Sequence, residues 1–168
     1  MIDVQKDYFE HGMFPLANAQ RVLENIANAI EQARQENIPI VLIQHIADPA
    51  GGPAPFFNAN TPGADIHPRI LEVAGDAPVV IKHFADSFER TQLQSVLKSH
   101  HVDTLLVCGM MTQNCVTHTA ISKAADAYRV TVLEDCCTTV SEILHAIAIH
   151  GLSTRVAISP WRDAILAE

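Results

Sequence analysis

Short apolar segments alternate along the chain with longer segments that carry a helical pattern. The apolar segments, which are rich in branched side chains, cover residues 38–44, 77–81, 104–108, 130–133 and 154–158. Apolar and polar positions alternate little within them, as in strands that are buried on both faces. Because strands that alternate with helices form parallel sheets, the pattern predicts a three-layer α/β/α fold with helices on both faces of the sheet.

The segment from residue 16 to residue 37 has the clearest helical pattern. Its apolar side chains recur on one stripe, at Val22, Ile26, Ala29, Ile30 and Ala33. Two further helix starts are indicated by capping boxes, in which Thr91 is followed by Gln94 and Thr139 by Glu142.

The amino end resembles the last part of a strand. Only two residues precede Asp3, whereas a typical strand has about five residues. Either the first strand is very short, or the sequence begins inside it.

Residues 47–76 interrupt the alternation of strands and helices. The segment is rich in proline and glycine, which predicts a long irregular loop, and such loops in compact domains are usually functional. Phe56 and Phe57 lie in this loop, where they either fix it to the rest of the domain or line a pocket.

Composition and charge narrow the possible partners. The chain has 168 residues, 48% of them hydrophobic and 18% charged, so we expect one folded domain over residues 1–168. The formal net charge of −8 argues against nucleic acid or an anionic membrane surface as the main partner. No apolar run approaches the roughly 18 residues of a membrane helix, and no signal peptide is recognisable.

The four cysteines do not form a disulfide framework, because Cys136 and Cys137 are adjacent and Cys108 lies in a predicted strand. This usage is typical of a reduced, cytoplasmic protein. Cys136 and Cys137 also lack the C-x-x-C spacing of redox motifs, so a structural role is expected for both.

Three reactive side chains follow predicted strands. Ligands of open parallel sheets bind at the carboxyl ends of the strands, where Asp3, Lys82 and Cys115 are expected. Cys115 comes after a tight turn, near the start of a predicted helix whose positive end would lower the pKa of a thiol. The alternatives are a buried, inert cysteine, a carboxylate that caps the sheet and a surface lysine.

Together these groups would form a nucleophilic site. A carboxylate can accept the thiol proton and return it to a leaving amine, and an ammonium group favours the thiolate.

Four segments, residues 3–9, 63–68, 82–91 and 109–116, carry the motifs of one known family. The first begins Asp-Val-Gln and the last reads Gly-Met-Met-Thr-Gln-Asn-Cys-Val. In this order, over nearly the whole chain, they resemble the isochorismatase-like cysteine hydrolases. The Gly-x-x-Thr-x-x-Cys-Val block is the most specific part of this resemblance.

The resemblance implies a fold and a set of site residues. The fold would be a Rossmann-like, six-stranded parallel sheet in the order 3-2-1-4-5-6, and the catalytic triad would be Asp3, Lys82 and Cys115. A cis peptide bond between Met110 and Met111 would direct the Met111 N–H, together with the Cys115 N–H, at the substrate oxygen. Tyr8 and Met111 would contact the substrate, and the protein would be a dimer or a tetramer.

The chain departs from the nicotinamidases of this family, which hold a metal through an Asp-x-His pair after the second strand. Here Asp48 is followed two positions later by Ala50. His45 and Asp48 offer metal-binding atoms, but the loop supplies no third ligand nearby. We therefore expect no metal, and the absence of nucleotide-binding motifs predicts no cofactor.

Other histidines carry weaker signals. His83, His100 and His101 lack helix-paired ligand spacing, so we expect them in solvent. His118, one helical turn after Cys115, is expected to be packed rather than to face the site.

The sequence thus predicts hydrolysis of a C–N bond in a small amide or carbamoyl-type substrate through a thioester on Cys115. Isochorismatase-type ether cleavage needs no thiol at this position, but it remains an alternative, as does a nicotinamidase. A catalytically silent, oligomeric binding module is a third possibility.

Overall fold

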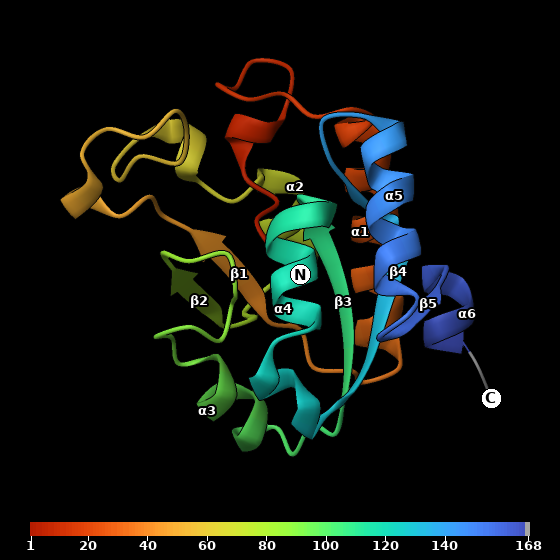
Figure 1. Ribbon diagram of the computed structural model, residues 1–168. Coiled ribbons are helices and arrows are strands. Elements are labelled where there is room, and N and C mark those ends of the chain that lie inside the picture. Colours follow the sequence, from red (N-terminus) through yellow and green to blue (C-terminus); the bar gives the residue numbers. More distant parts are fainter. Residues whose placement is uncertain (167–168) are drawn as a thin grey trace.

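The computed structural model describes residues 1–166 (Figure 1). Its strands are β1 (Leu42–His45), β2 (Val79–Lys82), β3 (Thr104–Met110), β4 (Arg129–Thr138) and β5 (Ala157–Ser159). Its α-helices are α1 (Ala19–Gln35), α2 (Pro68–Ala74), α3 (Leu93–Ser99), α4 (Thr117–Ala120), α5 (Glu142–Leu152) and α6 (Trp161–Leu166). Shorter helical segments are η1 (Lys6–Tyr8), η2 (Pro49–Gly51), η3 (Pro62–Ala64), the π-helix η4 (Thr112–Val116) and η5 (Lys123–Ala127).

All five predicted strand segments overlap a strand, and the alternation with helices is confirmed. The predicted loop is shorter than expected, because α2 begins at Pro68. Proline at the first position of a helix carries no N–H that would need a partner there. Pro68, which the sequence predicts to lie in the loop, therefore starts a helix.

The expected sheet of six strands is not confirmed. β1 pairs in parallel with β2, and β3, β4 and β5 form a second parallel group. Within residues 1–166, only Ile2 is bridged to both groups, in parallel to Ile43 and to Gly109. Its N–H donates to the Cys108 carbonyl at 2.8 Å, and its carbonyl accepts the Met110 N–H at 3.0 Å. The first strand is thus reduced to one bridging residue.

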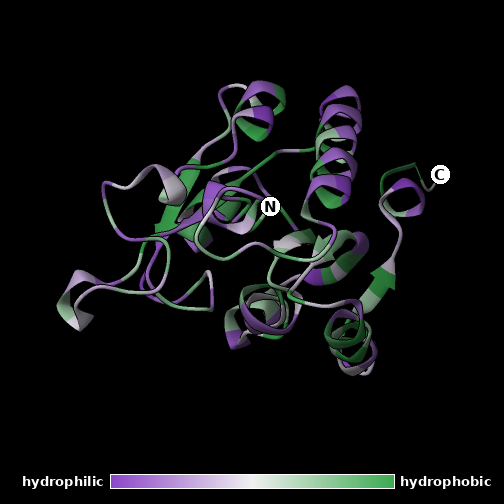
Figure 2. Ribbon diagram, turned by 90° about the horizontal axis from the view of Figure 1, so that it is seen from above, coloured by the Kyte–Doolittle hydropathy of each residue, from purple (hydrophilic) through white to green (hydrophobic). Residues whose placement is uncertain are grey.

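Helices lie on both faces of the strands, as predicted. α1 packs against α2, α6 and β4, whereas α4 lies in front of β3 in Figure 1, on the other side from α1. The predicted stripe of α1 is buried throughout. Figure 2 shows hydrophobic strands surrounded by helices of mixed character.

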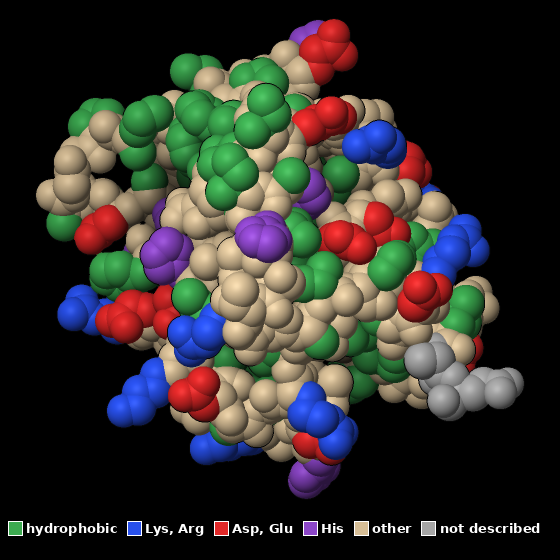
Figure 3. All heavy atoms as spheres, turned by 45° about the vertical axis from the view of Figure 1, so that its right-hand side comes forward, with side chains coloured by type: hydrophobic (Ala, Val, Ile, Leu, Met, Phe, Trp, Pro, Cys, Tyr) green, Lys and Arg blue, Asp and Glu red, His purple; other side chains and the backbone are tan. Residues whose placement is uncertain are grey.

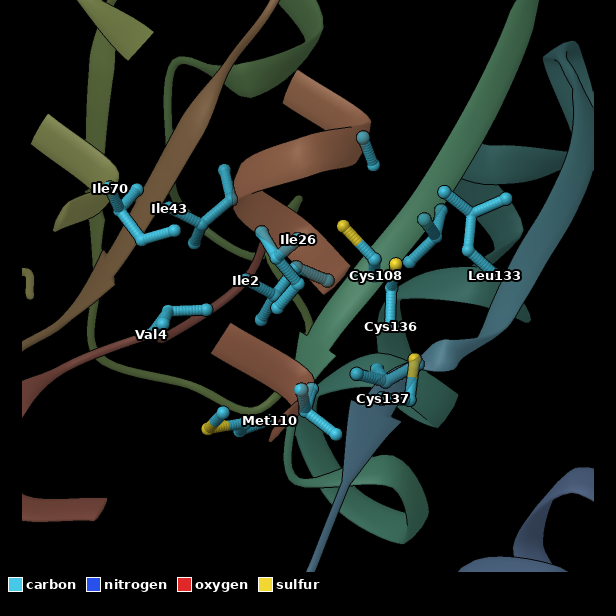
Figure 4. Close-up of a cluster of buried hydrophobic side chains, with 14 of the residues drawn as sticks. Ile2, Val4, Ile26, Ile43, Ile70, Cys108, Met110, Leu133, Cys136 and Cys137 are labelled. Atoms are coloured by element: carbon cyan, nitrogen blue, oxygen red, sulfur yellow. The ribbon is translucent and has the colours of Figure 1, made fainter. Parts of the chain in front are cut away.

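The core continues through the cysteines. Figure 4 shows Cys108, Cys136 and Cys137 among buried aliphatic side chains. Burial raises the pKa of all three thiols. The structural role predicted for Cys136 and Cys137 agrees with this position.

A cavity of about 160 Å³ lies between β1 and β3, on the amino side of Ile2. Apolar side chains of α1, α3 and both strands line it, among them Ile30, Val41, Leu97 and Leu106. The Met1 amino group donates to the Val41 carbonyl at 3.0 Å. The amino end of the chain therefore lies in the lining of this cavity.

Gly109 allows Ile2 to approach β3. Its φ of 127° is strained for other residues, and a Cβ atom there would overlap with the Ile2 carbonyl. We expect Gly109→Ala to lower the free energy of unfolding by about 2–4 kcal/mol, measured by urea denaturation. Gly151→Ala is the matched control, since no atom lies within 4 Å of its Cβ position. Equal stabilities of the two variants would contradict this role of Gly109.

Candidate active site

The structure brings the three predicted site residues together. Asp3 follows the bridging residue Ile2, Lys82 ends β2, and Cys115 lies in η4 after β3. The Lys82 Nζ atom is 2.8 Å from Asp3 Oδ2 and 3.2 Å from Cys115 Sγ. The exposed fractions are 0% for Asp3 and Lys82 and 2% for Cys115, so the contacts form away from solvent.

The neighbouring strands fix the position of Asp3. Its N–H donates to the Ile43 carbonyl at 3.0 Å, and the Ile43 N–H donates to the Met1 carbonyl at 2.9 Å. Asp3 has a φ of 52°, a left-handed conformation that aspartate adopts more readily than most residues. The chain turns immediately after the bridge, which leaves the carboxylate at the end of β1.

The turn before Cys115 differs from the expected one. The peptide bond between Met110 and Met111 is cis, where the sequence resemblance places one. Cys115 does not begin an α-helix, because it lies inside the π-helix and α4 starts only at Thr117. The Met111 carbonyl accepts the N–H groups of both Asn114 and Val116, at 3.0 and 3.3 Å. This wider turn replaces the predicted helix start.

Two hydroxyl groups hold the turn in place. Thr117 Oγ1 donates to the Thr112 carbonyl at 2.6 Å, and Thr112 Oγ1 is 2.9 Å from His145 Nδ1 of α5. The Met111 N–H donates to no acceptor within residues 1–166. It is therefore available for a substrate oxygen.

The thiol is neutral at rest, which corrects the expectation of a lowered pKa. Burial and then the charge of Asp3 raise the pKa of Cys115, and Lys82 only partly opposes them. Burial alone would lower the pKa of Lys82, but the interactions with Asp3 and Cys115 together outweigh it and the pKa is raised. The resting site is thus an Asp3–Lys82 ion pair beside a protonated thiol.

Asp3 has a free acceptor for the thiol proton. Its Oδ1 atom is buried and has no hydrogen-bond partner among the described residues. Oδ2 also lacks a well-aligned hydrogen bond, although it lies 2.8 Å from Lys82 Nζ; at this distance the contact is an ion pair. Since buried acceptors are rarely left unpaired, the carboxylate is suited to bind a proton during a reaction.

His45 is a fourth member of the site. From the sequence it is predicted only as a possible metal ligand. It ends β1, and its Nδ1 atom is 2.9 Å from Lys82 Nζ and 4.0 Å from Asp3 Oδ2. Burial, followed by the charge of Lys82, lowers the pKa of His45 to about 4. Like Lys82, His45 lies at the end of a predicted strand, and this position was the sequence signal that could have placed it in the site.

The site does not fit a metal ion while Lys82 is in place. Asp3, His45 and Cys115 offer ligand atoms within 4.8 Å of one another, a donor set that zinc accepts. The Lys82 ammonium, however, lies 2.8–3.2 Å from all three and already supplies the positive charge. Asp48 is directed elsewhere, since its carboxylate accepts the Ala50 N–H and caps η2.

Aromatic side chains cover one side of the site. Tyr8 is 1% exposed, and its ring centroid lies 4.6 Å from Phe57 and 5.5 Å from Phe56. Phe57 is also buried, lies 5.8 Å from the His45 ring, and donates its N–H to Asp7 Oδ2 at 2.8 Å. Phe57 thus fixes the loop to the domain and also lies beside the site.

Four histidines outside the site lie at the surface. His83, His100 and His101 are exposed, as predicted, but so is His118, which was expected to be packed. Its Nδ1 atom is 2.9 Å from the Asn114 carbonyl, so the ring contacts the preceding turn and extends into solvent.

No helix within residues 1–166 has the length and apolar character needed to cross a membrane.

The sequence is similar to those of several known proteins. A family model described as the isochorismatase domain matches residues 1–159. The chain is 35% identical over 139 residues to the uncharacterized isochorismatase family protein YddQ of Bacillus subtilis, covering 83% of this chain and 76% of that protein. It is 26% identical over 130 residues to N-carbamoylsarcosine amidase of Arthrobacter sp., covering 69% and 49%.

Among solved structures, the chain is similar to a putative isochorismatase hydrolase from Oleispira antarctica. The two share 30% identity and superpose with a TM-score of 0.86 over 99% of this chain and 94% of the other. The α/β Rossmann-like fold is therefore common to both.

Proposed function

This chain belongs to the isochorismatase family, and on that premise we propose that it is a cysteine hydrolase that cleaves a C–N bond in a small amide or carbamoyl-type substrate. One observation carries the proposal: the buried thiol of Cys115 lies against the Asp3–Lys82 ion pair. A thiol, a base and a cation within hydrogen-bond reach meet the requirements of nucleophilic catalysis.

In the first half of the proposed reaction, Cys115 Sγ attacks the substrate carbonyl carbon while Asp3 accepts the thiol proton. The C–S bond forms and the carbonyl electron pair moves to oxygen. When the intermediate collapses, the C–N bond breaks, and Asp3 returns the proton to the leaving amine. The product is a thioester on Cys115 and a free amine.

In the second half, water attacks the thioester carbon and gives a proton to Asp3. The C–S bond then breaks, the acid leaves, and Asp3 returns this proton to the sulfur. Lys82 keeps its charge throughout and stabilises the thiolate as it forms. Asp3 therefore transfers two protons in each cycle, and Lys82 transfers none.

The developing oxyanion would be bound by the N–H groups of Met111 and Cys115. The Met111 N–H has no acceptor among the described residues, which supports this assignment. Each such donor contributes roughly 2.7–4 kcal/mol in comparable sites. Tyr8 and Met111 would contact the substrate, because Tyr8 lies in the aromatic cover of the site and Met111 in the turn beneath it.

Three features favour this reaction over the alternatives. Ether cleavage does not use a thiol, whereas Cys115 lies at the centre of this site. A nicotinamidase of the metal-dependent kind would need ligands that Asp48 and Ala50 do not provide. A silent binding module would not need a buried acceptor such as Asp3 Oδ1.

The test is a screen of small primary amides and N-carbamoyl compounds with ammonia release as the readout. Turnover should be accompanied by a mass increase on the Cys115 peptide when the reaction is quenched early. Turnover without a covalent adduct on Cys115, or with an ether substrate only, would contradict the proposal.

We also propose that a second copy of the chain covers α5. Of its residues only Leu152 is buried, and Ile143 and Ile147 are 75% and 63% exposed. Hydrophobic side chains gather on the face that Figure 3 brings forward, the side of the molecule that carries α5. A helix that is apolar all round is normally buried, which supports a homo-oligomer.

We expect the double variant Ile143→Glu/Ile147→Glu to be monomeric at concentrations at which the unaltered protein is a dimer or tetramer, because two carboxylates on each copy would repel across the contact. Light scattering after gel filtration measures this. A second variant with Leu71→Glu, an exposed residue of α2, is the control. An unaltered protein that is monomeric would contradict the proposal.

A further inference from the structure

Three hydrogen-bond acceptors and one ion-pair partner surround the Lys82 ammonium group. Besides Asp3 and Cys115, its Nζ atom lies 2.9 Å from His45 Nδ1 and 3.1 Å from the Phe84 carbonyl. An ammonium group has three N–H donors and no acceptor. Three acceptors thus match the three N–H donors, and these hydrogen bonds together with the ion pair to Asp3 set the position of Nζ relative to the thiol.

Among these three acceptors, His45 is the imidazole, whose ring can carry its proton on either nitrogen. Since the ammonium cannot accept a hydrogen bond, Nδ1 must be unprotonated and the ring proton must lie on Nε2. Burial and the charges of Lys82 and His83 oppose protonation of His45, and the charge of Asp3 favours it. The outcome is a neutral ring with its lone pair toward Lys82.

The side chain of Gln5 fixes the main chain of His45 and thereby the position of the ring. Gln5 is fully buried, and its Oε1 atom accepts the His45 N–H while its Nε2 atom donates to the His45 carbonyl, both at 2.8 Å. Gln5 Nε2 also donates to the Ala64 carbonyl at 2.7 Å. One buried amide thus fixes both backbone groups of His45.

We propose that His45, whose main chain is fixed by Gln5, is a positioning residue. Its Nδ1 atom accepts a hydrogen bond from the Lys82 ammonium group and so holds Nζ between Asp3 and Cys115. The inference rests on the proposed function for its catalytic meaning, because Lys82 is the group that stabilises the thiolate. His45 itself forms no bond to substrate in this scheme. It affects the Cys115 thiol only by setting the position of Lys82 Nζ.

Two substitutions separate the acceptor atom from the bulk of the ring. In His45→Asn, the side-chain oxygen lies close to the position of Nδ1 and accepts the same hydrogen bond from Lys82. In His45→Leu, the volume is kept but the acceptor is lost. His83→Asn, at an exposed neighbour, is the control for a histidine outside the site.

The readout is the rate at which iodoacetamide alkylates Cys115, followed by mass spectrometry of its peptide from pH 6 to 10. We expect His45→Leu to react about tenfold more slowly at neutral pH, with its profile moved upward by about one unit, which corresponds to a tenfold smaller thiolate fraction. His45→Asn and His83→Asn should stay within about threefold of the unaltered protein.

Thermal unfolding of each variant shows whether it is folded, and Gln5→Glu is a second test if His45→Leu is not. A glutamate cannot donate to the His45 carbonyl, so this variant should show the same upward movement of the profile. A His45→Leu protein that alkylates like the unaltered one, or a folded His45→Asn protein as impaired as His45→Leu, would overturn the inference. A profile that responds to His45 in a protein that cleaves no amide would leave the inference standing and contradict the proposed function.

Discussion

Cys115→Ala is expected to lose at least about 10³-fold in turnover while keeping its fold. The thiol is the proposed nucleophile, and no other group in the site can form the thioester. Its removal deletes one sulfur from a well-packed environment, so the change in stability should be small compared with the loss of activity. Turnover and urea denaturation measure the two effects.

The matched control is Cys108→Ala. Cys108 is buried to a similar extent, with 6% exposed against 2% for Cys115, but it lies in the core beside β4. Its replacement should reduce stability and leave turnover per folded molecule unchanged. If the two alanine variants had equal activity, the thioester mechanism would be wrong.

Asp3→Asn is expected to have the second-largest effect, a loss of at least about 10³-fold in turnover together with about 3–5 kcal/mol of stability. An amide cannot accept the thiol proton, which explains the loss of activity. The loss of stability arises because Lys82, which is 0% exposed, would remain charged and buried without its partner.

The chain contains a matched pair for comparison. Lys6 and Asp65 form an ion pair of nearly the same length, 2.9 Å, but both side chains are exposed. Asp65→Asn should change the free energy of unfolding by less than about 1 kcal/mol, because exposed pairs are screened by water. The comparison therefore measures the effect of burial at constant chemistry.

A double variant separates the two roles of the buried pair. Asp3→Asn/Lys82→Met removes both charges, so much of the lost stability should return while turnover stays absent. Turnover that recovered in the double variant would show that Asp3 acts only by neutralising Lys82, and its assignment as the base would have to be abandoned.

The sequence was sufficient for the parts of the site that lie at strand ends. Asp3, Lys82 and Cys115 could be placed at one edge because each follows a strand, and parallel strands end on the same side. The turn of residues 109–116 could be recognised from its motif. These features depend on local pattern and on the direction of the chain.

Features that depend on contacts between distant segments were not predictable. The pKa of Cys115 is raised chiefly by burial. This burial is produced by side chains from several distant segments, and a local helix pattern does not reveal how they pack. The role of His45 was missed because one histidine at a strand end carries no motif; only the contact with Lys82 distinguishes it.

The pocket between β1 and β3 has a consequence for the binding of small apolar molecules. It is partly open to solvent and lined by apolar side chains, and a space of about 160 Å³ is large enough for a molecule such as benzene. A larger side chain at Ala33, which lines this space, would occupy part of it. Titration with benzene should then show weaker binding by Ala33→Leu than by the unaltered protein.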